Sequence, residues 1–274
     1  MKRLWVWVAA LAVLLWGCSG ENAEVKLNYG RLADVPAAKL EALGQQSFYF
    51  GHQSVGRDIM DGLGRLLAEH PEVKLNIVEG ERPDQVQPGV FLHSRIGQNE
   101  HPQTKIDAFE QVLASGIGGT ANVAFLKFCY VDLDQSGNPQ DLFNRYQASV
   151  TALKAKYPAT RFVHFTLPVR TVPTGWKVQI KNLIGREVPE QLDNLKRQQF
   201  NDLLRQTYGG KEPVFDLARL ESIAADTGKS HSFKLEGQTV EAMAPVNTND
   251  GGHLGDAGKR WIAEQLVVFL ATLG

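Results

Sequence analysis

A serine near the start of the chain and an aspartate–histidine pair near its end have the residue types needed to cleave an ester. Ser54 closes the segment Phe-Gly-His-Gln-Ser, and Asp250 and His253 lie in Asn-Asp-Gly-Gly-His, about 200 residues further on. A serine hydroxyl is a weak nucleophile until a base removes its proton, and a third group must orient that base. We therefore interpret Ser54 as a nucleophile, His253 as its base and Asp250 as the orienting carboxylate.

Each of these motifs also has a plain structural explanation. Serine is a common N-cap, and Ser54 directly precedes a predicted helix that starts near Val55. The two roles are compatible, because the glycines on either side of Ser54 permit a sharp turn between strand and helix. The Asp250–His253 segment has the alternative of a polar helix entry with a solvated histidine. The spacing of three favours the catalytic interpretation, since a turn lets the carboxylate reach one ring nitrogen while the other faces the serine.

A nucleophile first, with acid and base together at the far end, is the chain order of the SGNH (GDSL-like) hydrolases, which the sequence resembles over its whole mature length. The Asp-x-x-His block from Asp250 to His253 matches that family, and Gly97 matches its glycine after the second strand. The nucleophile block is divergent, because Gly-His-Gln-Ser, ending at Ser54, replaces Gly-Asp-Ser. The resemblance implies a three-layer α/β/α sandwich of flavodoxin-like topology and a Ser54–His253–Asp250 triad.

The resemblance is weakest at the oxyanion hole. The family takes donors from the serine N–H, from a glycine equivalent to Gly97 and from an asparagine after the third strand, where this chain has Val131. Losing one such donor costs about 2.7–4 kcal/mol of transition-state stabilisation. Asn99 is the first candidate to replace it, with a loop asparagine bonded to its own backbone as the alternative. The backbone or hydroxyl of Tyr130 and the ammonium of Lys127 are the other candidates.

The remaining ionisable residues give fewer indications of function. His52, close to the nucleophile, is a candidate for substrate contact. Lys127 on an apolar run has the alternative of a snorkelling residue or a buried ion pair with Asp132. Cys129 on the same run is expected to be an inert, buried thiol. The other histidines show no metal-ligand spacing, so we predict no metal and no cofactor.

Alternating apolar runs and helical patterns predict the elements that position these residues. Five runs have the composition of strands: 47–50, 73–78, 122–130, 161–167 and 213–217. Five stretches have helical periodicity: 55–69, 104–114, 140–156, 190–208 and 257–273. A Gly/Pro-rich loop is expected between residue 78 and the 104–114 helix. The alternation predicts one α/β domain over 41–274, with a five-stranded parallel sheet covered on both faces. Ligands bind beyond the carboxyl ends of such strands, where Ser54 falls.

Two segments exceed what such a sheet needs. The insertion near 171–190 carries Trp176 and Lys177, and the insertion near 230–244 resembles a hairpin that turns at Gly237. Loops of this length are usually functional or disordered. We expect both to form walls of a substrate cleft, in which Arg170, Trp176 and Lys177 are candidates to bind a sugar or an acidic polymer.

The first residues have the pattern of a lipoprotein signal peptide. Lys2 and Arg3 precede an apolar run from Leu4 to Trp16, too short to span a bilayer. Leu-Trp-Gly-Cys then resembles a bacterial lipobox, which implies removal of residues 1–17, lipidation of Cys18 and a tether over 18–40. The alternative is an ordinary secretory signal cleaved near Gly20. No aspartate follows the cysteine, so the prediction is a lipid-anchored protein of the cell envelope, at the outer membrane.

Composition excludes some partners and leaves the substrate open. The chain has 29 basic against 30 acidic residues, so it lacks the strong positive charge expected of a nucleic-acid-binding protein. The sequence therefore predicts a cell-envelope serine esterase or deacetylase that acts on an acyl ester, with O-acetylated glycan favoured. A carbohydrate O-acetyltransferase on the same triad, and a non-catalytic polysaccharide- or partner-binding lipoprotein, are the alternatives. The oligomeric state is not predicted.

Overall fold

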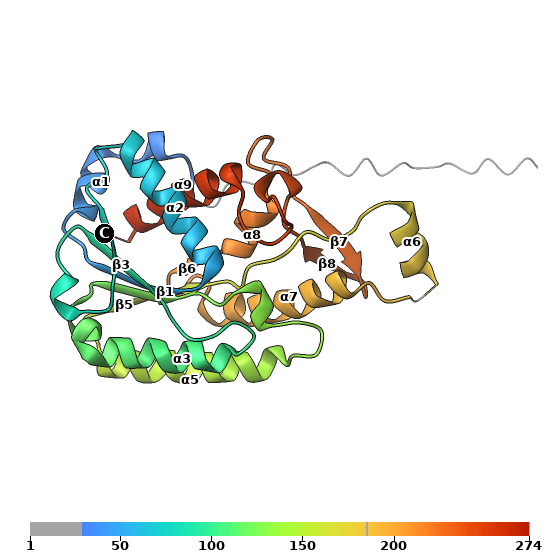
Figure 1. Cartoon of the computed structure of the whole chain (residues 1–274), viewed down its shortest axis with the longest axis horizontal. Helices are drawn as coiled ribbons and strands as arrows, with labels where there is room; N and C mark the ends of the chain where they lie inside the picture. Colours follow the sequence, from blue (N-terminus) through green and yellow to red (C-terminus); the bar gives the residue numbers. More distant parts are fainter. Residues whose placement is uncertain (1–28, 185, 274) are drawn as a thin grey trace, which may run out of the picture.

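A central parallel sheet organises the chain, with helices on both faces (Figure 1). The computed structural model describes residues 29–184 and 186–273, so the predicted signal peptide, lipobox and Cys18 lie outside the described residues. Six strands form the sheet, in the spatial order β2-β3-β1-β4-β5-β6. They are β1 (Phe48–His52), β2 (Asn76–Glu79), β3 (Val90–Arg95), β4 (Val123–Leu126), β5 (Arg161–Phe165) and β6 (Val214–Phe215).

Alternation along the strands assigns side chains to the two faces of the sheet. Phe48 and Phe50 of β1 pack on one face, whereas Tyr49 packs on the other, as the two-residue period of a strand requires. The first face is covered by α1 (Ala37–Leu43), α2 (Ser54–Glu69), α8 (Leu217–Ser222) and α9 (Asp256–Ala271). The second is covered by α3 (Pro102–Val112), α5 (Pro139–Lys156) and α7 (Pro189–Tyr208). The prediction of a three-layer α/β fold is confirmed.

The predicted strand count is wrong by one, because β3 lies in the stretch expected to be a loop. β3 pairs with β1 and β2, so it occupies a position inside the sheet. Its apolar run is only Val90 to Leu92, and His93 and Ser94 follow. Both polar side chains are buried through hydrogen bonds, His93 to His52 and Ser94 to Tyr49. A strand whose burial depends on such long-range partners gives a weak apolar signal.

The packed domain begins earlier than the predicted residue 41. Leu32 and Leu40 are buried in the core, and the Leu32 N–H donates to Glu264 of α9. The Tyr29 ring stacks on Phe215, and its hydroxyl donates to the Val214 carbonyl. Residues 29–40 are therefore part of the domain, not a tether.

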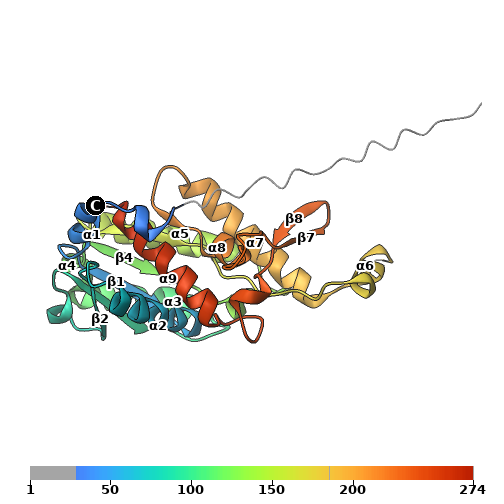
Figure 2. The same cartoon turned by 90° about the horizontal axis from the view of Figure 1, so that it is seen from above.

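The two insertions form separate features beside the carboxyl edge of the sheet. Residues expected to form a hairpin do so, as β7 (Ser232–Leu235) and β8 (Gln238–Glu241) in an antiparallel pair. The other insertion is an arm that carries α6 (Trp176–Leu183), which stands away from the rest of the domain in both views (Figure 2). Trp176 is 66% exposed. A short helix, α4 (Gly118–Thr120), precedes β4, and no described helix has the length and apolarity needed to span a bilayer.

Candidate active site

Ser54 is held at the junction of the central strand and its helix. β1 ends at His52, Gln53 occupies the N-cap position, and Ser54 begins α2 half-buried. A Cβ built on Gly56 would lie 2.3 Å from that of His52, so glycine lets the first turn of α2 pack directly on the strand end. The Ser54 N–H is among the first-turn donors that a helix cannot satisfy internally, and it lies at the positive end of the helix dipole. The sequence thus places a hydroxyl and an unused N–H at one half-buried turn.

Asp250 and His253 form the contact expected from their spacing. Asp250 Oδ2 lies 2.7 Å from His253 Nδ1, while Oδ1 accepts the N–H groups of Gly252 and His253 at 2.9 and 2.8 Å. Desolvation opposes ionisation, yet these hydrogen bonds hold the pKa of Asp250 well below its usual range. Gly251 has φ +85°, a conformation that favours glycine. The carboxylate thus stays ionised and fixes the Nδ1–H tautomer of the imidazole.

Hydrogen bonds tie the Asp250–His253 turn to the helix that Ser54 begins. The Leu254 N–H donates to Asp58 Oδ2 at 3.2 Å, one helical turn beyond Ser54, and Lys259 Nζ lies 3.1 Å from Asp58 Oδ1. The two ends of the chain are therefore fastened together at the carboxyl edge of the sheet. Within the described residues, Ser54 Oγ and His253 Nε2 have no hydrogen-bond partner, so the structure holds both near α2 without a direct bond between them. Such bonds are often long in the absence of substrate.

His52 does not have the substrate contact expected from its sequence position. The side chain is buried under α2, and the residue is 1% exposed. Its Nδ1 donates to the Gln53 carbonyl at 2.8 Å, so Nε2 of the neutral ring accepts from His93 Nδ1 at 2.9 Å. Burial lowers the pKa of His52 to about 3, and that of His93 is lowered by the same cause. His52 is a neutral core histidine whose partner lies on the strand that the sequence did not reveal.

Gln53 fastens the Gly97 loop to the nucleophile turn. Its Nε2 donates to the carbonyls of Ile96 and Gly97 at 3.0 and 2.7 Å. Gly97 has φ +60°, and a Cβ there would lie 2.5 Å from the backbone nitrogen of Lys105, so only glycine fits. No acceptor among the described residues takes the Gly97 N–H. The loop thus keeps a free donor next to the serine turn, as a glycine of the oxyanion hole requires.

Asn99 is oriented by a buried lysine. Lys105 Nζ donates to Asn99 Oδ1 at 2.9 Å and also contacts Asp132, and the Lys105 side chain is fully buried. An ammonium can only donate, so it fixes which end of the amide points inward. The exposed Asn99 Nδ2 is left without a partner among the described residues. Asn99 therefore presents an N–H donor to solvent on the same loop as Gly97.

Tyr130, a candidate replacement for the absent asparagine, packs against His253. Its ring lies edge-on to the imidazole, with centroids 5.6 Å apart, and its hydroxyl lies 3.5 Å from His253 Nδ1. A Cβ on Gly252 would lie 2.7 Å from the Tyr130 ring, so that glycine permits the contact. The Tyr130 carbonyl accepts from Arg197 Nε at 2.8 Å. These contacts place the Tyr130 ring against the imidazole and bond the Tyr130 backbone to α7.

Lys127 is fully buried and is not paired with Asp132, so the structure excludes both alternatives, a snorkelling side chain and this ion pair. Its Nζ donates to the Phe128 carbonyl at 2.9 Å and lies 3.7 Å from the Cys129 sulfur. Asp132 pairs instead with Lys105, which was not among the candidate residues. The signal was present, because Lys105 lies four residues before the buried Phe109 on the inward stripe of α3. Cys129 is buried and free.

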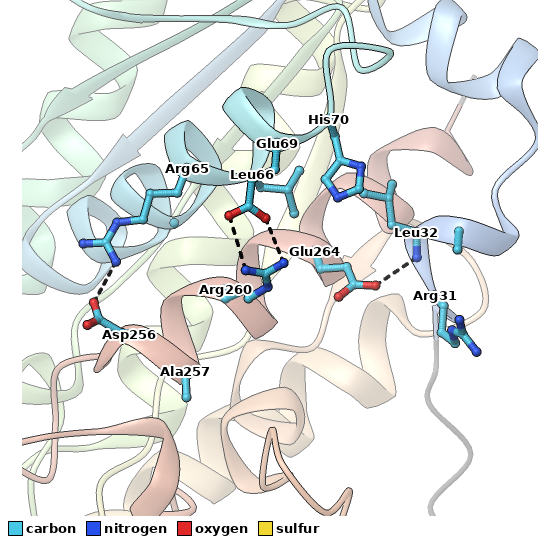
Figure 3. A pocket seen from close by; sticks show the side chains of 12 residues that line it. Arg31, Leu32, Arg65, Leu66, Glu69, His70, Asp256, Ala257, Arg260 and Glu264 are labelled. Atoms are coloured by element: carbon cyan, nitrogen blue, oxygen red, sulfur yellow. Dashed lines mark hydrogen bonds and ion pairs between the residues drawn. The ribbon is translucent and has the colours of Figure 1, made fainter.

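The cavity between α2 and α9 does not coincide with the candidate catalytic residues. A cavity of 540 Å³ lies between α2 and α9, where Arg65 pairs with Asp256 and Arg260 with Glu69 (Figure 3). Neither Ser54 nor His253 lines it. In residues 29–184 and 186–273, no group of three or more histidine, cysteine or carboxylate side chains is arranged to hold a metal ion.

Comparison with solved structures finds proteins that are similar to this chain over 68–87% of its length. The structure is similar to a GDSL-like lipase from Bacteroides thetaiotaomicron, with 13% identity, a TM-score of 0.47, and coverage of 87% of this chain and 96% of the other. It is similar to the periplasmic domain of a lipopolysaccharide acetyltransferase of Salmonella Paratyphi A, with 11% identity, a TM-score of 0.41, and coverage of 86% and 98%. A peptidoglycan O-acetylesterase matches with 14% identity, a TM-score of 0.38, and coverage of 68% and 47%.

Comparison of the sequence alone identifies no relative. No protein-family model matches the chain, and no curated protein matches it significantly. At these identities and TM-scores, the structural likenesses assign neither a substrate nor a reaction. The residues of the site therefore have to carry the assignment of activity.

Proposed function

We propose that the chain is an SGNH-type serine esterase that cleaves an acyl ester. The observation that carries the proposal is the 2.7 Å bond between Asp250 and His253, in a turn that is itself bonded to the helix begun by Ser54. The carboxylate binds Nδ1 of the imidazole and so fixes the ring, and Nε2 has no protein partner among the described residues. Such a histidine is suited to take a proton from a nearby hydroxyl.

The proposed reaction proceeds through an acyl-enzyme. Ser54 Oγ attacks the ester carbonyl as its proton passes to His253 Nε2, and Asp250 stabilises the imidazolium. The N–H groups of Ser54 and Gly97, with Asn99 Nδ2, hold the oxyanion. The imidazolium returns its proton to the departing alcohol, and a water molecule then releases the acid by the same route. These steps need no metal or cofactor.

A fluorophosphonate probe tests this proposal, because it phosphonylates only an activated serine. We expect wild-type protein to be labelled at Ser54, identified by mass spectrometry of the modified peptide. Ser54→Ala and His253→Ala should abolish labelling, while Ser136→Ala, in an exposed loop, should not. Folded wild-type protein that resists labelling would refute the esterase proposal.

A non-catalytic envelope protein that binds polysaccharide or a partner through this site is the second candidate. It is favoured by Val131 in place of the asparagine donor and by the missing bond between Ser54 and His253. Under this alternative the wild-type chain binds glycan and is not labelled. A carbohydrate O-acetyltransferase would be labelled like an esterase, and it differs by transferring the acyl group to an added sugar faster than to water.

We further propose that Cys18 anchors the protein by lipid to the cell envelope, at the outer membrane. This proposal rests on the lipobox-like sequence, which precedes the described residues. Metabolic labelling with an alkyne analogue of palmitate should tag the wild-type chain but not Cys18→Ser. Cys129→Ser, which alters the buried thiol, is the matched control. Equal labelling of the wild-type and Cys18→Ser chains would refute lipidation at this residue.

A further inference from the structure

Arg170 is fixed next to the Asp250–His253 turn by its backbone. Its N–H donates to Asn194 Oδ1 at 3.1 Å, and its carbonyl accepts from Asn194 Nδ2 at 2.8 Å, so α7 clamps the residue on both sides. The next residue, Thr171, donates its N–H to the Gly251 carbonyl at 3.0 Å. The backbone of Arg170 is therefore held in place, and the next residue is bonded to the turn that carries the proposed base.

The guanidinium of Arg170 extends toward the histidine side of the site. Its Cζ lies 5.2 Å from the centre of the Tyr130 ring, and that ring packs edge-on against His253. Tyr130 thus contacts both the guanidinium of Arg170 and the imidazole of His253. Arg170 therefore lies on the Tyr130 side of the proposed proton carrier, whereas Gly97 and Asn99 lie on a different loop.

Arg170 has no ion-pair partner among the described residues. Its guanidinium forms no ion pair or hydrogen bond there, and its Nε is buried without an acceptor. Arg197, whose Cζ lies 5.9 Å from the same ring, differs in this respect. Its Nε donates to the Tyr130 carbonyl, one terminal nitrogen donates to Asn194 Oδ1, and Asp193 lies 3.8 Å away. Two guanidiniums therefore flank Tyr130, and only that of Arg170 is left without an acceptor within the described chain.

A partly desolvated cation beside a second cation is unfavourable until an anion binds it. Removing charge from water costs several kcal/mol unless a partner compensates, and a guanidinium meets a carboxylate or phosphate with two parallel hydrogen bonds. The hydrogen bonds to Asn194 fix the backbone of Arg170, so binding an anion has to order only the side chain. Arg170 therefore has the charge and the fixed backbone expected of an anion-binding residue.

We propose that Arg170 binds a carboxylate or phosphate group on the alcohol part of the ester, so that the substrate class is the acyl ester of an acidic alcohol, such as an acidic sugar. This inference rests on the proposed esterase function. The alcohol part is assigned because His253 returns its proton to the departing alcohol, which must therefore lie against the imidazole. The carbonyl oxygen faces the donors of Ser54 and Gly97 instead. Arg170 lies on the imidazole side and so meets the alcohol.

A matched pair of esters tests the inference: 4-acetoxybenzoate, whose alcohol carries a carboxylate, and its neutral methyl ester. The quantity measured is the ratio of kcat/KM for the two esters. In the wild-type chain we expect the carboxylate ester to be preferred, and Arg170→Gln to lower that preference about tenfold or more, as loss of a charge-assisted hydrogen bond does. Arg170→Lys should retain part of it. Lys181→Gln, which removes an exposed charge from α6, should leave the ratio unchanged.

Each outcome bears on one proposal. Equal use of both esters by the wild-type chain, or an unchanged ratio in Arg170→Gln, would overturn the anion site while the esterase proposal stands. Failure of the wild-type chain to hydrolyse either ester, with no fluorophosphonate labelling, would overturn the esterase proposal itself. If Arg170→Gln does not fold, the salt dependence of the wild-type ratio decides. Because Arg170 is half-buried, salt screens its contact with an anion in part, so a preference that is unchanged at high salt in the wild-type chain would overturn the anion site.

Discussion

Lys105 Nζ lies 2.5 Å from Asp132 Oδ2, and neither side chain is exposed to solvent. The other oxygen of Asp132 accepts the Glu100 N–H at 3.0 Å, and Oδ2 also accepts the Cys129 N–H at 2.6 Å. Lys105 in turn holds Asn99. Through Asn99 and Glu100, this ion pair therefore joins the loop after β3, which carries the candidate donors Gly97 and Asn99, to the turn after β4.

Breaking this pair should destabilise the fold. Lys105→Met leaves the Asp132 carboxylate buried without its cation, and removing one partner of a buried pair costs about 3–5 kcal/mol. Urea denaturation should show a loss of this size in the free energy of unfolding. The double variant Lys105→Met/Asp132→Asn should lose less than the two single variants added together, since it buries no unpaired charge. Additive losses would show that the two side chains do not interact as described.

Asp250→Asn should reduce activity without loss of fold. The amide oxygen can still accept the N–H groups of Gly252 and His253, but its NH₂ group faces His253 Nδ1 and favours the wrong tautomer. A fall in the rate of fluorophosphonate labelling of about a thousandfold to ten-thousandfold is expected. Asp256→Asn, on the exposed start of α9, is the control and should label at the wild-type rate. A fall of less than tenfold in Asp250→Asn would argue against this carboxylate as the orienting group.

Much of the fold could be predicted from the sequence because most strands are continuously apolar and the long helices have clear periodicity. α5 and α7 each begin one residue before their predicted starts, at Pro139 and Pro189. The sequence does not reveal β3, since His93 and Ser94 are buried by bonding to partners about 40 residues away. Polar side chains that are buried because they are hydrogen-bonded leave no apolar pattern in the sequence. His52 was misassigned for the same reason, because its partner lies on that strand.

The site was predictable where its contacts are local in sequence. Asp250 and His253 share one turn, so their spacing alone indicated their bond. By contrast, the position of Arg170 depends on Asn194 and Gly251, which only the folded chain brings together. Lys105 is intermediate, since its place on the inward stripe of α3 is visible in the sequence, whereas its partner Asp132 is not.

The contribution of Asn99 to the oxyanion hole should be that of one hydrogen-bond donor. Asn99→Ala removes the Nδ2 donor, and loss of one such donor lowers kcat about a hundredfold to a thousandfold. The hydrolysis of 4-nitrophenyl acetate, compared with the wild-type chain, measures the effect. Gln98→Ala truncates the exposed neighbouring side chain on the same loop and should remain within about twofold of wild type.

Two results separate a catalytic Asn99 from a structural one. If Asn99 acts as a donor, kcat falls while the free energy of unfolding changes by no more than one lost hydrogen bond, about 1–3 kcal/mol. If it serves only to satisfy Lys105, stability falls and kcat of the folded protein does not. In the second case Tyr130 remains as the candidate replacement for the family's asparagine, because the Lys127 ammonium is fully buried and donates to the Phe128 carbonyl.

Glu221 should make the fold less stable as the pH rises. Its side chain is fully buried on α8, where Oε2 accepts the Val169 N–H at 2.8 Å and Oε1 has no partner among the described residues. Desolvation raises the pKa of Glu221 to about 8, although the Val169 N–H and the charge of Lys127 oppose the rise. The folded chain therefore keeps a proton that the unfolded chain has lost.

The sign of the effect follows from proton binding. Between the ordinary value of 4.5 and about 8, the unfolded state binds fewer protons at this site than the folded state, so its contribution to stability is complete below this window and is lost across it. The loss is at most about 1.4 kcal/mol per pH unit. Glu221→Gln, which mimics the protonated carboxyl, should remove this slope, whereas Glu41→Gln on the exposed face of α1 should keep it. Parallel plots of unfolding free energy against pH for the wild-type chain and Glu221→Gln would show that the buried carboxyl is ionised throughout.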